Sequence, residues 1–302
     1  MKKILVVGSL NMDLVTELNR TPKVGETTIG GNIVKIPGGK GANQCAAMAR
    51  LGADVSMIGR VGKDEYGDIL IDTLKEFGAK TDGIKKDEKV DTGLAFIMVN
   101  ADGDNSIVVI PGANFSLVKE DISRDMVEEC DFVVAQFETP LEIVKEVFRI
   151  SKELGKKNVL NPAPAKEIDD EMISLVDILV PNETELEILT AIKINGMDDI
   201  DRGAKALLDK GVEEVIVTLG KDGSKYYSKD KTIKVDGKVV KAVDTTAAGD
   251  SYIGGLIYSL SKGMEIEEAM NYATMVSALT VTKKGAQSSL PSAKEIKDYF
   301  NL

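Results

Sequence analysis

Short apolar runs alternate with amphipathic helical segments along most of the chain, and this rhythm restricts the fold more than any other feature. The runs are rich in β-branched residues, which is typical of strands buried on both faces. They comprise Lys3–Gly8, Val55–Gly59, Phe132–Ala135, Asn158–Leu160, Ile178–Val180 and Val215–Thr218. Helical patterns follow two of them, at Tyr66–Phe77 and Leu141–Leu154. The alternation predicts a three-layer, Rossmann-like α/β fold, in which helices cover both faces of a mostly parallel sheet.

Two segments, at about 14–37 and 90–112, interrupt the alternation. The second one has the pattern of two strands, Thr92–Val99 and Asn105–Ile110, joined by a hairpin turn at Ala101–Asp104. From the residues alone, an edge hairpin with no moving role is one interpretation of it. No repeat and no Pro/Ser-rich linker divides the chain, so we expect a single domain over residues 1–302.

Composition excludes several classes of function. A formal net charge of −11 and a pI near 4.8 argue against partners such as nucleic acid or an anionic membrane. A phosphate site in this chain must therefore use local amides, a few lysines and a metal. The sequence has no signal-peptide pattern and no apolar run long enough to span a bilayer, which predicts a cytoplasmic location.

The chain contains no histidine, which excludes Ser–His and Cys–His catalysis and His-ligated zinc. A general base working near neutral pH must then be a carboxylate, a lysine, a tyrosine or a thiol. The two cysteines, Cys45 and Cys130, are expected to be small buried apolar residues and not a disulfide.

The stretch from Ala242 to Tyr252 has the pattern of a loop that ends a strand and opens a helix. The residues before it, including Val239–Val243, are rich in β-formers. Ala247, Ala248 and Gly249 fall where a helix N-terminus presents unpaired amides, and such a site favours anions. Asp250 lies at its edge, so an anion cradle next to a base is predicted, as phosphoryl transfer to an alcohol requires. The alternative is that Asp250 is an ordinary N-cap.

Polar residues also follow the opening strand. Asn11 and Asp13 stand at its carboxyl end, where open α/β sheets place ligands, although both residue types are common in turns. Gly38–Asn43 precedes a helical run, Gln44–Leu51, and could be a flexible loop with a solvated Lys40. It is not a Walker A motif, and no dinucleotide glycine fingerprint follows the first strand.

Two of these stretches resemble the signatures of the PfkB-type carbohydrate kinases, the ribokinase superfamily. Asp244–Asp250 reads DTTAAGD and Gly38–Gln44 reads GGKGANQ, in the family's order and about two hundred residues apart. The widest family pattern has Gly at the position of Ala247, and Ala there resembles the ribokinases within the family. The sequences PGAN at 111–114, QFETP at 136–140 and NPAPA at 161–165 also resemble ribokinases.

The resemblance assigns roles to residues at the matching positions. It implies that Asp250 is the catalytic base and that the amides of Ala247, Ala248 and Gly249 stabilise the transferring phosphoryl group. The residues it places at the sugar are Asn11, Asp13, Gly39, Lys40, Asn43, Glu138 and Asp250.

The resemblance also implies the cofactors ATP, Mg²⁺ and K⁺. It associates Asn182, Glu185, Thr218, Gly220, Gly223 and Gly249 with the nucleotide, its phosphates and Mg²⁺. The alternative for Glu185 is a carboxylate that stabilises a helix N-terminus. The residues implied for the monovalent cation, mostly through carbonyl oxygens, are Asp244, Thr246, Thr280, Lys283, Gly285 and Ser289.

The activity implied is the ATP-dependent phosphorylation of D-ribose at its 5-hydroxyl to give ribose 5-phosphate. Another small-sugar kinase of the same superfamily, acting on deoxyribose or fructose, is the main alternative, and a nucleoside kinase is less favoured. A catalytically inactive sugar sensor would be expected to lack the base or the anion turn. By resemblance the interrupting segments form a small β-sheet lid over the sugar, through which two copies pair as a homodimer.

Overall fold

The main sheet has nine strands, and its order confirms the predicted α/β architecture. The structure is a computed structural model that describes residues 1–302. The strand order is β13-β12-β11-β10-β9-β8-β1-β4-β5, with parallel pairs from β5 to β11 and antiparallel pairs at β11–β12 and β12–β13. The strands are β1 (Ile4–Val7), β4 (Val55–Gly62), β5 (Lys80–Asp87), β8 (Phe132–Ala135), β9 (Lys157–Leu160), β10 (Ile178–Leu179), β11 (Glu214–Thr218), β12 (Ser224–Ser228) and β13 (Thr232–Val235).

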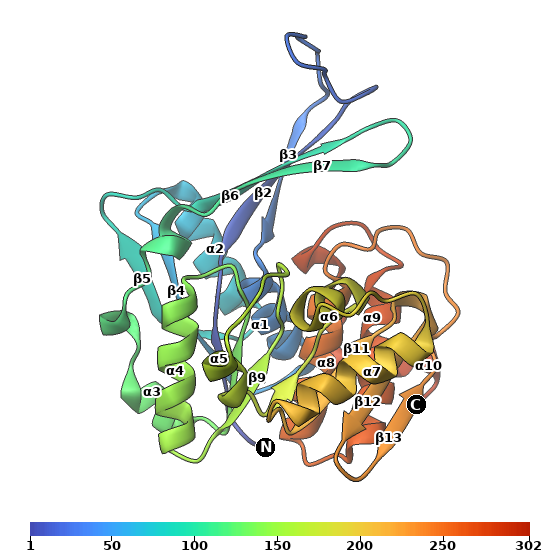
Figure 1. Cartoon of the computed structure of the whole chain (residues 1–302). Coiled ribbons are helices and arrows are strands. Elements are labelled where there is room, and N and C mark those ends of the chain that lie inside the picture. The colour runs from blue at the N-terminus through green and yellow to red at the C-terminus, as the bar shows by residue number, and fades with distance from the viewer.

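Helices cover both faces of this sheet, so the molecule has two apolar cores (Figure 1). In β1, Ile4 and Val6 face one core whereas Leu5 and Val7 face the other, because successive side chains of a strand alternate. One layer consists of α1 (Lys40–Leu51), α2 (Glu65–Glu76), α8 (Ala248–Ser261), α9 (Ile266–Thr280) and α10 (Ala293–Phe300). The other consists of α3 (Arg124–Glu129), α4 (Leu141–Glu153), α5 (Asp170–Ser174), α6 (Glu183–Thr190) and α7 (Met197–Asp209).

A second sheet of four strands stands away from this body (Figure 1). Its order is β3 (Ile33–Gly38), β2 (Asn11–Glu17), β6 (Gly93–Val99) and β7 (Asn105–Ile110). The β2–β6 pair is parallel and the two outer pairs are antiparallel. The edge-hairpin interpretation is therefore incomplete, because the β6–β7 hairpin pairs with a strand from the first interrupting segment.

Several helices begin where local sequence supports a helix start. Asp64 caps α2 by accepting from the Gly67 amide at 2.8 Å, and Asn182 caps α6 by accepting from the Glu185 amide at 2.8 Å. No helix in the chain has the length and apolar character that crossing a membrane would require. Cys45 and Cys130 are free and buried, as expected.

The structure corrects two local predictions. Val239–Val243 forms no strand, because the chain leaves the sheet edge after Val235 and the side chains of Val239 and Val243 are exposed. The helix predicted from Gln44 begins at Lys40, so Lys40–Asn43 of the glycine-rich motif form the first turn of α1 and Gly39 is its N-cap. The helix after the anion loop begins at Ala248, which confirms the helix N-terminus predicted at Ala247–Gly249.

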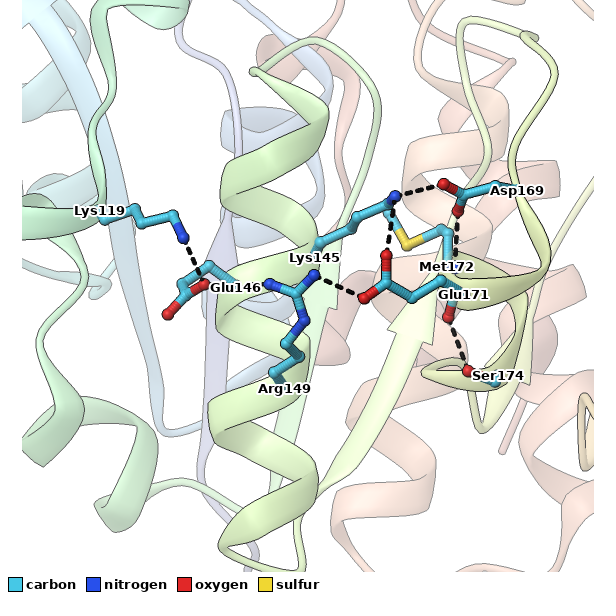
Figure 2. Close-up of polar contacts among 8 residues, drawn as sticks. All are labelled: Lys119, Lys145, Glu146, Arg149, Asp169, Glu171, Met172 and Ser174. Carbon is cyan, nitrogen blue, oxygen red and sulfur yellow. Dashed lines mark hydrogen bonds and ion pairs between the residues drawn. The ribbon is translucent and has the colours of Figure 1, made fainter.

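An ion-pair cluster joins α4 to the segment that enters α5, and Figure 2 shows it. The Lys145 side chain, only 7% exposed, donates to Asp169 at 2.5 Å and to Glu171 at 3.3 Å. Arg149 on the next turn of α4 also donates to Glu171, at 2.6 Å. This cluster holds the C-terminal end of the segment that begins at Asn161, after β9, against α4.

Candidate active site

A cavity of about 230 Å³ lies at the carboxyl ends of the central parallel strands. Open α/β sheets bind ligands at this edge. The cavity is lined by Lys40, Asn161, Ala163, Val180, Asn182, Glu185, Thr218, Thr245, Ala247, Ala248, Gly249, Asp250 and Ile253. Eight of these thirteen residues belong to the set predicted from sequence, namely Lys40, Asn182, Glu185, Thr218, Ala247, Ala248, Gly249 and Asp250.

The N-terminus of α8 presents free amides to this cavity. Ala247 is the N-cap and adopts φ 59°, a left-handed conformation that a residue with a Cβ rarely takes. The amides of Ala247, Gly249 and Asp250 have no acceptor within the protein, whereas that of Ala248 donates to the Thr245 carbonyl at 3.2 Å. The Asp250 amide was not predicted as part of this cradle. Unpaired amides at the positive end of a helix favour a bound anion.

Asp250 is not the N-cap of α8, so that alternative is wrong. It is the third residue of the helix, and its carboxylate is 7% exposed. Both oxygens accept hydrogen bonds from α1: Oδ2 from Asn43 Nδ2 at 2.9 Å and Oδ1 from Gln44 Nε2 at 3.0 Å. A buried carboxylate held in this way by neutral amides keeps lone pairs for a further proton donor.

Lys40 is the first residue of α1 and is partly buried, not a solvated loop residue. Its ammonium group has Asp250 as its strongest charge partner, with smaller contributions from Glu138, Glu185 and Asp13, and these charges raise its pKa against the effect of burial. Lys40 thus interacts both with carboxylates predicted for the sugar and with Glu185, which was predicted for the phosphates.

The residues predicted for the sugar lie next to this lysine. Asn11 and Asp13 are buried on β2, and Glu138 follows β8. Burial raises the pKa of Asp13 to about 7, with a further contribution from the negative charges of Glu138 and Asp250. When Asp13 is deprotonated, its carboxylate can accept hydrogen bonds, but no protein group donates one to it. The positive charge that acts on it is that of Lys40.

Glu138 and Gly39 hold the start of α1 against β2. Glu138 Oε2 accepts from Ser9 Oγ at 2.6 Å and from the Lys40 amide at 3.0 Å. Gly39 has φ 88°, and a Cβ there would lie 2.7 Å from the Asn11 nitrogen. Only glycine fits this close approach of two backbones.

The residues predicted for the nucleotide separate into two groups. Asn182 and Glu185 form a reciprocal capping box on α6, and burial raises the pKa of Glu185. Thr218 ends β11 beside them and pairs with Asn182 through an isolated bridge. Gly220 and Gly223 lie instead in the hairpin between β11 and β12, outside the cavity lining. A Cβ at Gly223 would collide with the Val235 carbonyl, so packing within the protein already requires glycine at this position.

The residues predicted for a monovalent cation lie where two loops meet. Val243 N and Asp244 N both donate to the Val281 carbonyl, at 2.7 and 3.2 Å. The Asp244 carboxylate accepts from the Gly285 amide and from Thr246, with distances of 2.6 to 2.9 Å. The carbonyl oxygens that accept no hydrogen bond are those of Asp244, Thr246, Lys283 and Gly285, whereas that of Thr280 accepts from Lys283 N. Ser289 Oγ donates to the Ala286 carbonyl at 2.7 Å.

Sequence reasoning did not assign Asn161, Ala163, Val180, Thr245 and Ile253 to the site, although they line the cavity. It also did not identify Gln44 as a partner of Asp250. Asn161 had a usable signal, because it follows a predicted strand in the same way as Asn11 does. Gln44 had none, because its contacts depend on how α1 packs against α8.

Three comparisons agree with this geometry. Residues 1–293 match the model of the pfkB family carbohydrate kinase. A protein named ribokinase from Staphylococcus aureus (strain COL) is 40% identical over 298 residues, which cover 97% of this chain and 98% of that protein. A deoxyribokinase from Salmonella typhi is also 40% identical, over 99% of both chains. The structure of Arabidopsis thaliana ribokinase complexed with ribose and ATP superposes with a TM-score of 0.94 at 31% identity, covering 100% of this chain and 99% of that one.

Proposed function

The chain belongs to the pfkB family of carbohydrate kinases, and we propose that it transfers the γ-phosphoryl group of ATP to the 5-hydroxyl of D-ribose. One observation carries this proposal. The buried Asp250 carboxylate lies on the same helix turn as the unpaired amides of Ala247 and Gly249. A proton acceptor next to an anion cradle is the arrangement that moves a phosphoryl group to an alcohol.

In the proposed reaction, Asp250 accepts the proton of the hydroxyl as its oxygen attacks the phosphorus atom. The unpaired amides of Ala247, Gly249 and Asp250 stabilise the charge on the transferring group, and the Ala248 amide, which donates to the Thr245 carbonyl at 3.2 Å, contributes less. Removing one donor from such a cradle costs about 10²–10³ in rate. Lys40, whose strongest charge partner is Asp250, adds a cation to the same cavity.

The sugar is proposed to bind through Asn11, Asp13, Gly39, Lys40, Asn43 and Glu138. Two of these residues have free hydrogen-bonding capacity facing inward. Asn43 Oδ1 is buried without a protein partner, and no protein donor contacts the Asp13 carboxylate. Buried polar atoms are normally hydrogen-bonded, so sugar hydroxyls are suitable partners for both.

ATP is the proposed phosphoryl donor, with Asn182, Glu185, Thr218, Gly220, Gly223 and Gly249 near it. Mg²⁺ is proposed as its companion, and the donor set fits, because the carboxylates of Glu185 and Asp250 both line the cavity. Mg²⁺ keeps most of its waters and binds through few carboxylates plus the phosphates, whose charge it neutralises. The chain's own part is to hold Glu185 in place through the Asn182 capping box.

K⁺ is proposed to bind between the Asp244–Thr246 turn and the loop at 280–289. The unpaired carbonyl oxygens of Asp244, Thr246, Lys283 and Gly285 fit a cation of low charge density. Thr280 contributes less in this arrangement, because Lys283 N already occupies its carbonyl at 3.1 Å. The Ser289 hydroxyl keeps free lone pairs although it donates to Ala286.

The four-stranded sheet is proposed as a lid on a single domain and as the contact surface of a homodimer. Its lid segments are the insertions at about 14–37 and 90–112. The sheet exposes apolar side chains that a monomer rarely leaves in water, at 39–63% exposure: Ile33, Val34, Phe96, Ile107, Val108, Val109 and Ile110. Sedimentation of the wild type and of Ile107→Glu and Val108→Glu variants tests this, since a monomeric wild type would contradict it. A cytoplasmic location stays a prediction.

Deoxyribose is the second candidate substrate, because the deoxyribokinase is as similar to this chain as the ribokinase is. The two sugars differ by one hydroxyl. A site that hydrogen-bonds a substrate hydroxyl through buried polar groups rejects the analogue lacking it by about 10⁴–10⁵.

A coupled assay of ADP release with ribose, 2-deoxyribose, fructose and adenosine tests the proposal, with K⁺ present or replaced by Na⁺. We expect the highest kcat/KM with ribose and a lower rate without K⁺. A preference for deoxyribose would move the assignment to the second candidate. Turnover with none of the four acceptors would contradict it.

A further inference from the structure

A continuous chain of buried amides runs from the sheet to the carboxylate of Asp250. Gln136 Nε2 donates to Gln44 Oε1 at 2.6 Å, and Gln44 Nε2 donates to Asp250 Oδ1 at 3.0 Å. The same nitrogen also donates to Asn161 Oδ1 at 3.1 Å. Gln44 and Gln136 are 0% and 1% exposed, so water does not compete for these bonds.

The direction of this chain is fixed at the carboxylate end, because Gln136 Oε1 has no hydrogen-bond partner whereas ionised Asp250 can only accept. The NH₂ group of Gln44 must therefore face the carboxylate and Asn161, which leaves Gln44 Oε1 to accept from Gln136. The reversed orientation would place a carbonyl oxygen against Asp250. The Oε1 atom of Gln136 lies next to Gly8, where an added Cβ would come within 2.3 Å of it. Position 8 therefore has no room for a side chain while Gln136 is in this place.

Two helices hold the acceptor in register with these donors. Asn43 and Gln44 lie on the first turn of α1, and Asp250 lies on the first turn of α8. One turn further along, Ala47 and Gly254 lie in contact, and a Cβ at Gly254 would overlap that of Ala47. Residues four apart share a helix face, so this contact sets the separation of Asn43 and Asp250.

We propose that Gln44 is a positioning residue that aims the Asp250 carboxylate, and that Gln136 supports the Gln44 amide in this orientation by donating to its Oε1. This inference rests on the proposed function, because it assumes that Asp250 is the base. With Oδ1 held by Gln44 and Oδ2 by Asn43, the carboxylate cannot rotate, and its remaining lone pairs point in fixed directions. A base that is already oriented loses less freedom when the hydroxyl arrives.

Gln44 is in direct contact with Asp250, so a charge introduced at position 44 would change the proton affinity of the proposed base. The charged groups that face Asp250 from the neighbouring elements are Lys40, Asp13 and Glu185. Gln44 adds a neutral donor between them. Gln44→Glu, which keeps the size of the side chain, replaces that donor by a carboxylate and disfavours the ionised form of Asp250.

The test compares kcat, KM and the pH profile of kcat for Gln44→Met, Gln44→Glu and Gln136→Met. For Gln44→Met we expect kcat to fall about 10–100-fold with KM for ATP little changed. For Gln44→Glu we expect a similar loss and an acid limb of the profile displaced upward by about one pH unit or more. Gln136→Met should lower kcat alone but cause little further loss in the Gln44→Met background, because the two act in series.

A matched control separates this role from a loss of stability. Asn158 is equally buried and donates to the Phe148 and Leu175 carbonyls, away from the cavity. Asn158→Leu should lower the melting temperature and leave the acid limb in place. Wild-type kcat and pH profiles in Gln44→Met and Gln44→Glu, with Asp250→Asn inactive, would overturn the positioning role alone. Normal turnover by Asp250→Asn would overturn the proposed base itself.

Discussion

Replacing Gly254 by alanine tests how closely α1 and α8 must pack for the candidate base to work. A Cβ at Gly254 would lie roughly 1 Å or more inside the ordinary carbon–carbon separation of about 3.5–4.0 Å from the Cβ of Ala47. Side-chain rotation does not relieve this overlap, because the position of each Cβ is fixed by the backbone of its own helix. The two helices must therefore separate by about 1 Å at this point.

That displacement is large on the scale of the site. The bonds from Asn43 and Gln44 to Asp250, at 2.9 and 3.0 Å, would stretch to about 4 Å, beyond hydrogen-bonding range. Overpacking costs about 1–3 kcal/mol, and the better helix propensity of alanine returns about 1 kcal/mol. We expect a net loss of stability of about 0–2 kcal/mol, but a fall in kcat of about a hundredfold.

The assay is steady-state ADP release at saturating sugar and ATP, with the free energy of unfolding measured in urea. Gly255→Ala is the matched control, because its Cβ would lie 2.9 Å from Ala273 Cα and Val276 Cγ2 on α9. It should destabilise the protein similarly and lower kcat much less. Equal losses of kcat in the two variants would refute the reasoning that the α1–α8 separation positions Asp250.

Three further predictions follow from single contacts. Burial raises the pKa of Asp13 from 3.8 to about 7, so the stability of the neutral carboxyl is fully present below pH 3.8 and is lost as pH rises through 7. Denaturation at pH 5 and pH 8 should therefore show Asp13→Asn gaining stability relative to wild type at the higher pH, and a constant difference would contradict the shift. Lys145→Met should lower the melting temperature and weaken its dependence on salt, because the carboxylates of the ion pairs in Figure 2 are half exposed and salt screens them. An unchanged melting curve would contradict a stabilising role of these ion pairs. Ala247→Gly should change the free energy of unfolding by about 1 kcal/mol or less, since relief of the strain at φ 59° is offset by a more flexible unfolded chain, and a loss above about 2 kcal/mol would show that the strain is absent.

The sequence was sufficient to predict the six consecutive strands from β11 to β4 in the main sheet, because each of them carries its own pattern, whereas the outer strands β5, β12 and β13 were not predicted as part of it. Ile4–Val7 and Phe132–Ala135 are short, β-branched and bounded by turns, so no distant contact was needed to recognise them. Val239–Val243 has the same composition but no neighbour to pair with, and it remains exposed coil. Local propensity does not say whether a partner strand is available.

The candidate site was predictable where a motif supplies backbone amides, and less so where side chains meet across helices. The anion turn at Ala247–Gly249 follows from small residues at a helix start. Lys40 was harder to place, because the four carboxylates whose charges act on its ammonium group come from distant parts of the sequence. Gln44 could not be assigned at all, since its contact with Asp250 spans 206 positions of sequence.

The most direct measurement of the central claim is kcat for Asp250→Asn together with ATP affinity by calorimetry. Asparagine keeps the size of the side chain but cannot take up a proton. If Asp250 is the base, kcat falls by several orders of magnitude while ATP binds as tightly as to the wild type. Turnover within a few-fold of wild type would contradict the account.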